Sequence, residues 1–147
     1  MKTEKILAID PGGMTGIVRW NGEKVEQAVE IPGDEIYAFL KPFLLHSEVV
    51  VIEKFKIYPS TSIALGWGPA DVAELIGAVK YGAWLLRIPV VMQEPAARRP
   101  FQFNKGDVID GQKLGKHSSD AFAHLLYYLN SQGHTAHVGP YLRIRSS

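Results

Sequence analysis

The chain has 147 residues, 46% of them hydrophobic, and a mean hydropathy of −0.02, which indicates one globular domain spanning residues 1–147 with one sizeable core. It contains no cysteine, so a disulfide framework and a thiolate metal site are excluded. Its apolar runs are too short for a membrane span or a signal peptide, so we expect a cytoplasmic protein without membrane contact.

The net charge of +1 hides a basic excess near the carboxyl end. Residues 98–147 hold 7 basic and 3 acidic side chains. The basic residues before the last predicted helix are Arg98, Arg99, Lys105, Lys113 and Lys116. Such a cluster could neutralise phosphates. The alternative is a solvated loop with ordinary surface charges.

The first half of the chain predicts four strands and a helix. The apolar run 6–9 is typical of a central strand, and it presents Asp10 in a Pro-Gly-Gly turn. Asn21-Gly22 predicts a type I′ turn between strands 15–20 and 24–30. Apolar residues at helical spacing follow over 36–44, where Pro42 should bend or divide the helix. The fourth strand, 49–53, ends on Glu53.

The second half predicts two helices around one more strand. Residues 58–68 are expected to form a loop, and a helix should run from Pro69 to Arg87. A short strand over 90–92 precedes a polar loop over 100–115. Ser118 is the predicted cap of the final helix, and 133–147 is predicted as an irregular tail. This order predicts an α/β fold, a mixed five-stranded sheet with helices on both faces.

Three acids stand at element boundaries. Asp10 and Glu53 each end a strand, and the carboxyl ends of neighbouring parallel strands meet at one edge of a sheet. Asp120 lies at the start of the last helix, where it can share a face with His117. Hard divalent cations bind carboxylate oxygen, so this pattern predicts a metal site.

Alternatives to that site remain open. Each acid taken alone could stabilise a turn, end a strand at the surface or complement a helix N-terminus. His117, Asp120 and His124 could also form a zinc triad along one helix.

Three motifs carry a family resemblance: Asp-Pro-Gly with Thr-Gly close behind, Ile-Glu-Lys-Phe, and His-Ser-Ser-Asp-Ala. Together, over about residues 4 to 131, they resemble the RuvC-like Holliday-junction resolvases of the ribonuclease H-like superfamily. The resemblance implies a ribonuclease H-like fold and a metal-dependent crossover-junction endodeoxyribonuclease that cleaves branched DNA such as four-way junctions. The short length and weak basicity are compatible with a viral version of the family.

The resemblance also implies roles for individual residues. Asp10 would bridge two Mg²⁺ ions per active site, for which Mn²⁺ could substitute. Glu53 would hold one ion and Asp120 the other, while His117 would bind metal or transfer a proton.

For DNA, the resemblance places an aromatic residue near Phe55, which would stack at the branch point, and a phosphate contact at the Ala-Ala-Arg stretch. The expected DNA-binding residues are Phe55, Lys56, Arg98, Arg99, Lys105, Lys113 and Lys116. The resemblance also implies a homodimer, since two symmetric nicks require two active sites related by a two-fold axis. It places the dimer surface on the helix from Pro69 to Arg87, whose small residues could instead pack on the sheet. The rival functions are an ATPase domain of the actin and hexokinase type and a non-catalytic module that binds branched DNA.

Overall fold

A mixed five-stranded sheet forms the centre of the molecule in the computed structural model, which describes residues 2–54 and 68–145. The strand order is β3-β2-β1-β4-β5. The strands are β1 (Ile6–Asp10), β2 (Met14–Trp20), β3 (Val25–Pro32), β4 (Val49–Glu53) and β5 (Val90–Gln93). β1 is antiparallel to β2 and parallel to β4, which is parallel to β5. The predicted α/β fold is confirmed.

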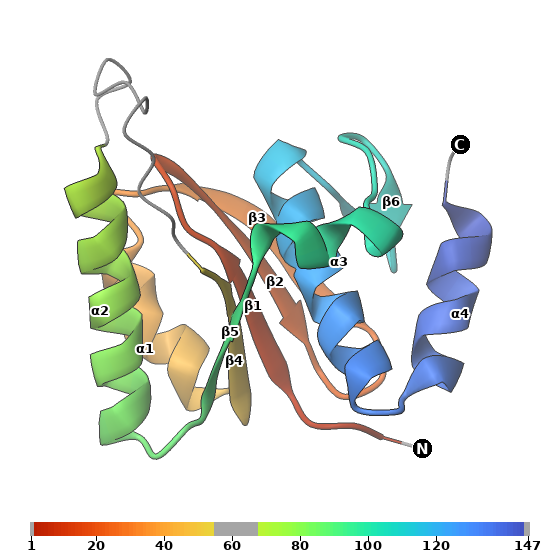
Figure 1. The fold of residues 1–147 in the computed structure, drawn as a ribbon, viewed down its shortest axis with the longest axis horizontal. Coiled ribbons are helices and arrows are strands. Elements are labelled where there is room, and N and C mark those ends of the chain that lie inside the picture. The colour runs from red at the N-terminus through yellow and green to blue at the C-terminus, as the bar shows by residue number, and fades with distance from the viewer. Residues whose placement is uncertain (1, 55–67, 146–147) are drawn as a thin grey trace.

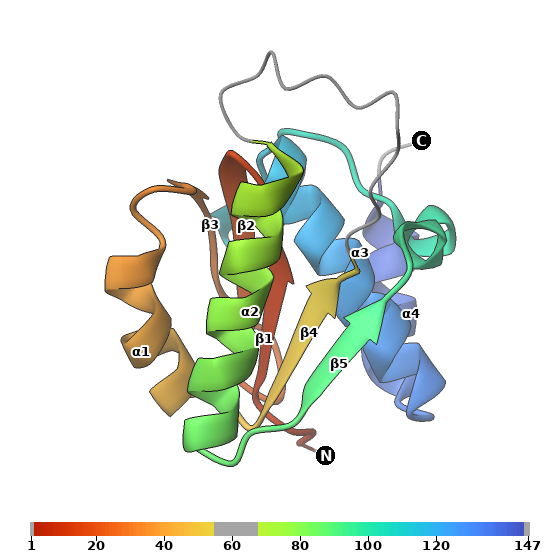
Figure 2. The same ribbon diagram turned by 60° about the vertical axis from the view of Figure 1, so that its left-hand side comes forward.

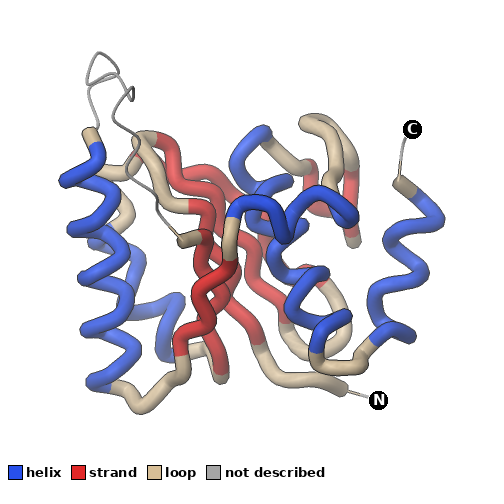
Figure 3. Tube along the Cα trace, in the orientation of Figure 1, coloured by secondary structure: helices blue, strands red, loops and turns tan. Residues whose placement is uncertain are grey.

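Helices cover both faces of this sheet (Figures 1 and 3). The helices α1 (Tyr37–Leu45) and α2 (Pro69–Leu85) lie on one side. On the other side α3 (Lys116–Ser131) packs on the sheet, and α4 (Thr135–Ile144) packs beside α3. A 3₁₀ segment, η2 (Pro95–Phe101), follows β5 and contacts α3. Within 2–54 and 68–145, no helix is long and apolar enough to cross a membrane.

Alternation along β1 decides which way Asp10 points. Every residue of β1 is buried, because helices cover the sheet on both sides. Ile6 and Ala8 belong to the apolar cluster under α3, whereas Leu7 and Ile9 belong to the cluster under α1 and α2. Successive side chains of a strand point to opposite faces, so Asp10 follows Ala8 onto the α3 face.

β4 repeats this arrangement beside β1 (Figure 2). Val49 and Val51 lie in the cluster under α3, so Glu53 also points to the α3 face. The register pairs Ile9 with Ile52, which places Asp10 and Glu53 side by side at the end of the two strands. The sheet therefore delivers two carboxylates to one edge and one face.

The turn between β2 and β3 differs from the prediction. A type I′ turn requires positive φ at both central residues, but only Gly22 has it, with φ 104°. The Asn21 side chain instead accepts hydrogen bonds at 3.0 Å from the backbone N–H groups of Glu23 and Lys24. The prediction of a type I′ turn is therefore wrong, because the Asn21 side chain organises a longer turn.

The predicted irregular tail is also wrong, since α4 occupies most of residues 133–147. Its Val138 and Tyr141 are buried, and the Tyr141 ring lies 6.0 Å from the Trp20 ring, centroid to centroid. The Tyr141 hydroxyl donates to the Asp110 carboxylate at 2.6 Å. These contacts hold a helix that contains Pro140, which local sequence rules disfavour.

Residues 100–115 are more ordered than the predicted loop. They contain the end of η2 and a short hairpin of β6 (Val108–Ile109) and β7 (Gln112–Lys113). The Gln112 side chain accepts a hydrogen bond from the Ala28 N–H at 3.3 Å, which fastens the hairpin to β3. Long-range pairing of this kind leaves little trace in the local sequence.

Two helix details also differ from expectation. α3 begins at Lys116 with Gly115 as its cap residue, and Ser118 accepts a hydrogen bond from the Gly115 N–H at 2.8 Å. Ser118 therefore completes the cap from inside the helix and is not the cap residue itself. Pro42 lies within α1 without dividing it.

Candidate active site

Asp10, Glu53 and Asp120 converge at the carboxyl ends of β1 and β4, beside the first turns of α3. Asp10 is 9% exposed, and the Glu53 and Asp120 side chains are also largely buried. The sequence-based prediction that these acids share one place agrees with the structure. Three carboxylates in a poorly solvated crevice repel one another, so the site needs positive charge.

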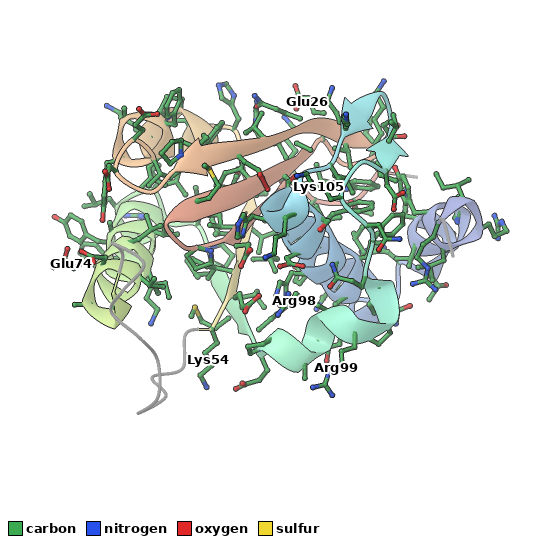
Figure 4. The ribbon with its side chains drawn as sticks, turned by 90° about the horizontal axis from the view of Figure 1, so that it is seen from above. Glu26, Lys54, Glu74, Arg98, Arg99 and Lys105 are labelled. Carbon is green, nitrogen blue, oxygen red and sulfur yellow. The ribbon has the colours of Figure 1, made fainter. Side chains whose placement is uncertain are left out.

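Arg98 supplies part of that charge from η2. Its Nε lies 3.3 Å from Glu53 Oε2, and its Nη1 lies 2.8 Å from Asp120 Oδ2. Burial works to lower the pKa of Arg98, but Glu53 and Asp120 outweigh it, so the pKa is raised. In Figure 4 Arg98 points toward α3 and the end of the sheet, while Arg99 and Lys54 project outward.

The crowding of the acids has its largest effect on the pKa of Asp10. Burial raises its pKa from 3.8 to about 8, with Glu53 and Asp120 adding to the rise and Arg98 opposing it. The carboxyl is therefore mostly protonated at neutral pH in the metal-free protein. A divalent cation would reverse this preference, because it favours the ionised form of its ligands.

His117 stands at the more exposed rim of the site. Its Nδ1 lies 3.4 Å from Asp10 Oδ2, and its side chain is 35% exposed. The Glu30 carboxylate on β3 accepts a hydrogen bond of 2.5 Å from the backbone N–H of His117, and this contact fixes the start of α3 against the sheet. Glu30 thus places His117, and through α3 also Asp120.

Gly16 explains why a Thr-Gly pair follows Asp10. A Cβ at Gly16 would clash with the backbone carbonyl of His117. Its absence lets β2 touch the first turn of α3 and brings His117 to Asp10. The glycine is therefore required by close backbone approach.

The donor set fits a hard divalent cation in its chemistry, since Asp10, Glu53 and Asp120 offer carboxylate oxygens of the kind that Mg²⁺ and Mn²⁺ bind. In the present arrangement no group of three or more His, Asp or Glu side chains within 2–54 and 68–145 is ready to hold a metal. Arg98 is paired with two of the three acids, so a cation at this place would have to replace its charge.

Comparison with known proteins finds solved structures with the same fold. No protein-family model and no curated protein sequence matches the chain. RuvC of Thermus thermophilus in complex with a Holliday junction substrate superimposes with a TM-score of 0.65 at 18% identity, over 90% of this chain and 98% of that one. A second Thermus thermophilus RuvC structure gives a TM-score of 0.60 at 21% identity, over 88% of this chain and 96% of that one. The chain has the RuvC-like fold.

Among the described residues that were expected to bind DNA, Arg98 differs from the others in its surroundings. Arg99, Lys105, Lys113 and Lys116 are exposed, whereas Arg98 is paired with the acids of the site. Phe55 and Lys56 lie outside the described residues, as do residues 58–67 of the loop expected over 58–68. The proposed roles of all these residues in binding DNA stay predictions.

Glu30 and Gln93 are among the residues of the site that were not recognised from the sequence patterns used above. Gln93 ends β5 in register with Glu53, so the rule that found Asp10 and Glu53 could also have found it. Glu30 acts across 87 residues of sequence, and no local signal marks it.

The zinc triad along α3 is not what the structure shows. Both ring nitrogens of His124 are engaged elsewhere, Nδ1 with Gln93 and Nε2 with Glu53. His124 therefore interacts with Glu53 and is not placed to act as a third ligand beside His117 and Asp120.

Proposed function

We propose that the protein is a metal-dependent, structure-selective endonuclease that hydrolyses phosphodiester bonds of branched DNA such as Holliday junctions. The observation that carries the proposal is the convergence of Asp10, Glu53 and Asp120 at the strand ends of a RuvC-like fold. The Thermus thermophilus RuvC of similar fold is bound to a Holliday junction substrate, which supports branched DNA as the ligand class.

Asp10, Glu53 and Asp120 would hold Mg²⁺ or Mn²⁺ ions, two per site. Bound there, such ions would activate the attacking water and stabilise the leaving oxygen. Asp10 would give up its proton as its carboxylate becomes a ligand. His117 lies beside Asp10 at the rim, where its ring nitrogen could accept or return a proton or serve as a further ligand.

DNA would approach the edge at which the acids lie. Arg99, which follows Arg98 on η2, and Lys116, which precedes His117 at the start of α3, are exposed and would contact phosphates. Such contacts orient the backbone without reading its sequence, which suits selection of a branched shape.

A homodimer is part of the proposal. α2 exposes Tyr81, Trp84 and Leu85 by 62%, 72% and 56%, and the rings of Tyr81 and Trp84 stack at 6.2 Å between centroids. Large apolar side chains gathered on one helix are typical of an interaction surface. A two-fold pairing through α2 would supply the second active site for two symmetric nicks.

A second candidate function has one observation in its favour. Because Arg98 already pairs with two of the three acids, a module that binds branched DNA without cleaving it is compatible with the site. The ATPase alternative has no comparable support in the geometry.

A nicking assay separates these functions. Purified protein would be incubated with a synthetic four-way junction or a linear duplex of the same sequence, with Mg²⁺, Mn²⁺ or EDTA, and ATP hydrolysis would be followed in parallel. We expect metal-dependent nicks in the junction only, lost in Asp10→Asn and Glu53→Gln. Glu26→Gln is the matched control, because it makes the same chemical change at a surface acid paired with Arg19. Binding of the junction without nicks at any metal concentration would favour the non-catalytic module.

A further inference from the structure

Three polar side chains from three elements form a line that ends at Glu53, one of the acids of the site. His124 on α3 is fully buried, at 0% exposure, and lies one turn after Asp120. Its Nδ1 is 2.6 Å from Gln93 Oε1 on β5, and its Nε2 is 2.8 Å from Glu53 Oε2 on β4. Gln93 is itself 5% exposed. Such short polar contacts in a hydrophobic core strongly restrict side-chain rotation.

The chemistry of the partners fixes the direction of one hydrogen bond. An ionised carboxylate only accepts hydrogen bonds, so Nε2 carries a hydrogen and donates it to Glu53. The Gln93 amide meets the other ring nitrogen, and in either orientation of the amide this contact fixes the plane of the ring. Gln93 therefore orients the ring of His124, and His124 in turn orients the carboxylate of Glu53.

The two carboxylate oxygens of Glu53 therefore differ in their contacts. His124 and Arg98 both contact Oε2, and among the described residues neither of these donors contacts Oε1. His124 stays buried even if Arg98 moves, because apolar neighbours such as Phe122 and Leu125 hold α3 on the sheet. His124 can thus keep Glu53 in place when the charge of Arg98 is exchanged for that of a cation.

We infer that His124 is a positioning residue for Glu53, oriented in turn by Gln93, and that it prepares the carboxylate to bind a divalent cation. The part concerning the cation rests on the proposed function. The competing explanation is a buried histidine that only satisfies its neighbours and stabilises the core. The two differ in one measurable respect, because only a positioning residue changes metal affinity beyond any change in folding stability.

Two substitutions at His124 separate shape from hydrogen bonding. His124→Gln places an amide N–H near the position of Nε2, whereas His124→Leu keeps an apolar side chain of similar reach without a donor. Removing a hydrogen-bond partner of a metal ligand typically weakens metal affinity by about 10- to 100-fold. We expect a loss of that size for His124→Leu and recovery to within a few-fold of wild type for His124→Gln.

The measurement is calorimetric titration of the full chain with Mn²⁺, beside thermal unfolding in EDTA. Tyr128→Phe is the matched control, because it removes a hydrogen bond of 2.8 Å to Glu4 from the same helix, away from the acids. It should lower the melting temperature and leave Mn²⁺ affinity unchanged. Gln93→Leu should weaken Mn²⁺ binding in the wild-type background and have no further effect beside His124→Leu.

The outcomes separate the inference from the proposed function. If wild type binds Mn²⁺ and His124→Leu binds it equally well, the positioning role is overturned and the nuclease proposal stands. If wild type binds Mn²⁺ with the expected dependence on His124 but cleaves no junction, the inference stands and the nuclease proposal fails. If wild type binds no Mn²⁺, both fail.

Discussion

Replacing Asp10 with asparagine should stabilise the metal-free protein increasingly as the pH rises, although it removes a residue proposed to be essential for cleavage. Burial, followed by Glu53 and Asp120, raises the pKa of Asp10 to about 8. The folded protein therefore holds the Asp10 proton more tightly than the unfolded chain does. This contribution to stability is fully present below the unfolded pKa of 3.8 and is lost as the pH rises through about 8.

The size of the effect follows from the two pKa values. Each tenfold preference for the protonated form corresponds to ~1.4 kcal/mol, so the rise from 3.8 to about 8 has a ceiling of about 5–6 kcal/mol. Even half of this, ~3 kcal/mol, is a large share of the ~5–15 kcal/mol that stabilises an ordinary domain. Asparagine has nearly the same shape and no charge to bury, so it avoids the loss.

The free energies of unfolding of Asp10→Asn and of wild type would be measured by urea unfolding in EDTA, followed by tryptophan fluorescence, from about pH 5.5 to about pH 9. The free energy of unfolding of Asp10→Asn minus that of wild type should grow by up to ~1.4 kcal/mol per pH unit and level off above about pH 8. Glu26→Gln, at an exposed acid, should show no such trend. A difference between Asp10→Asn and wild type that stays constant over the whole range would refute the reasoning.

Three further predictions concern the surroundings of Asp10. Gly16→Ala should destabilise the protein by ~2 kcal/mol or more, because the added methyl group would push the start of α3 off β2; an unchanged melting temperature would contradict the close approach. Arg99→Ala should lower the slope of log affinity for a four-way junction against log salt by about one, and an equal slope would place Arg99 away from phosphate. His117→Asp should keep Mg²⁺-dependent nicking while His117→Ala loses most of it; full activity in both variants would limit the site to the three acids.

The strand ends of the site could be predicted from the sequence because their signals are local. The runs before Asp10 and Glu53 are rich in isoleucine and valine, and each stops at an acid followed by polar or turn-forming residues. Strand periodicity then fixes which side chains share a face. The same rule applied to β5 would have found Gln93.

Arg98, Glu30 and α4 could not be placed in the same way. The sequence marked Arg98 only as basic, and its pairing with Glu53 and Asp120 arises where η2 contacts α3. Glu30 lies on β3 and contacts the start of α3, which is 87 residues away in the sequence. α4 contains Pro140 and is held by packing of Tyr141 against Trp20. These features arise from tertiary contacts that override local propensity.

The pairing of Ile9 with Ile52 has a consequence for how this protein can change over evolution. Deleting one residue within β4 would move its valines from one apolar layer to the other and turn Glu53 away from α3. Folding and the proposed cleavage activity would therefore be lost together, so we expect selection on strand length for both reasons. Substitutions that keep the alternation remain free to accumulate, which is how a shared architecture can persist at 18% to 21% identity. We expect length variation among relatives to fall between the strands and not within β1 or β4.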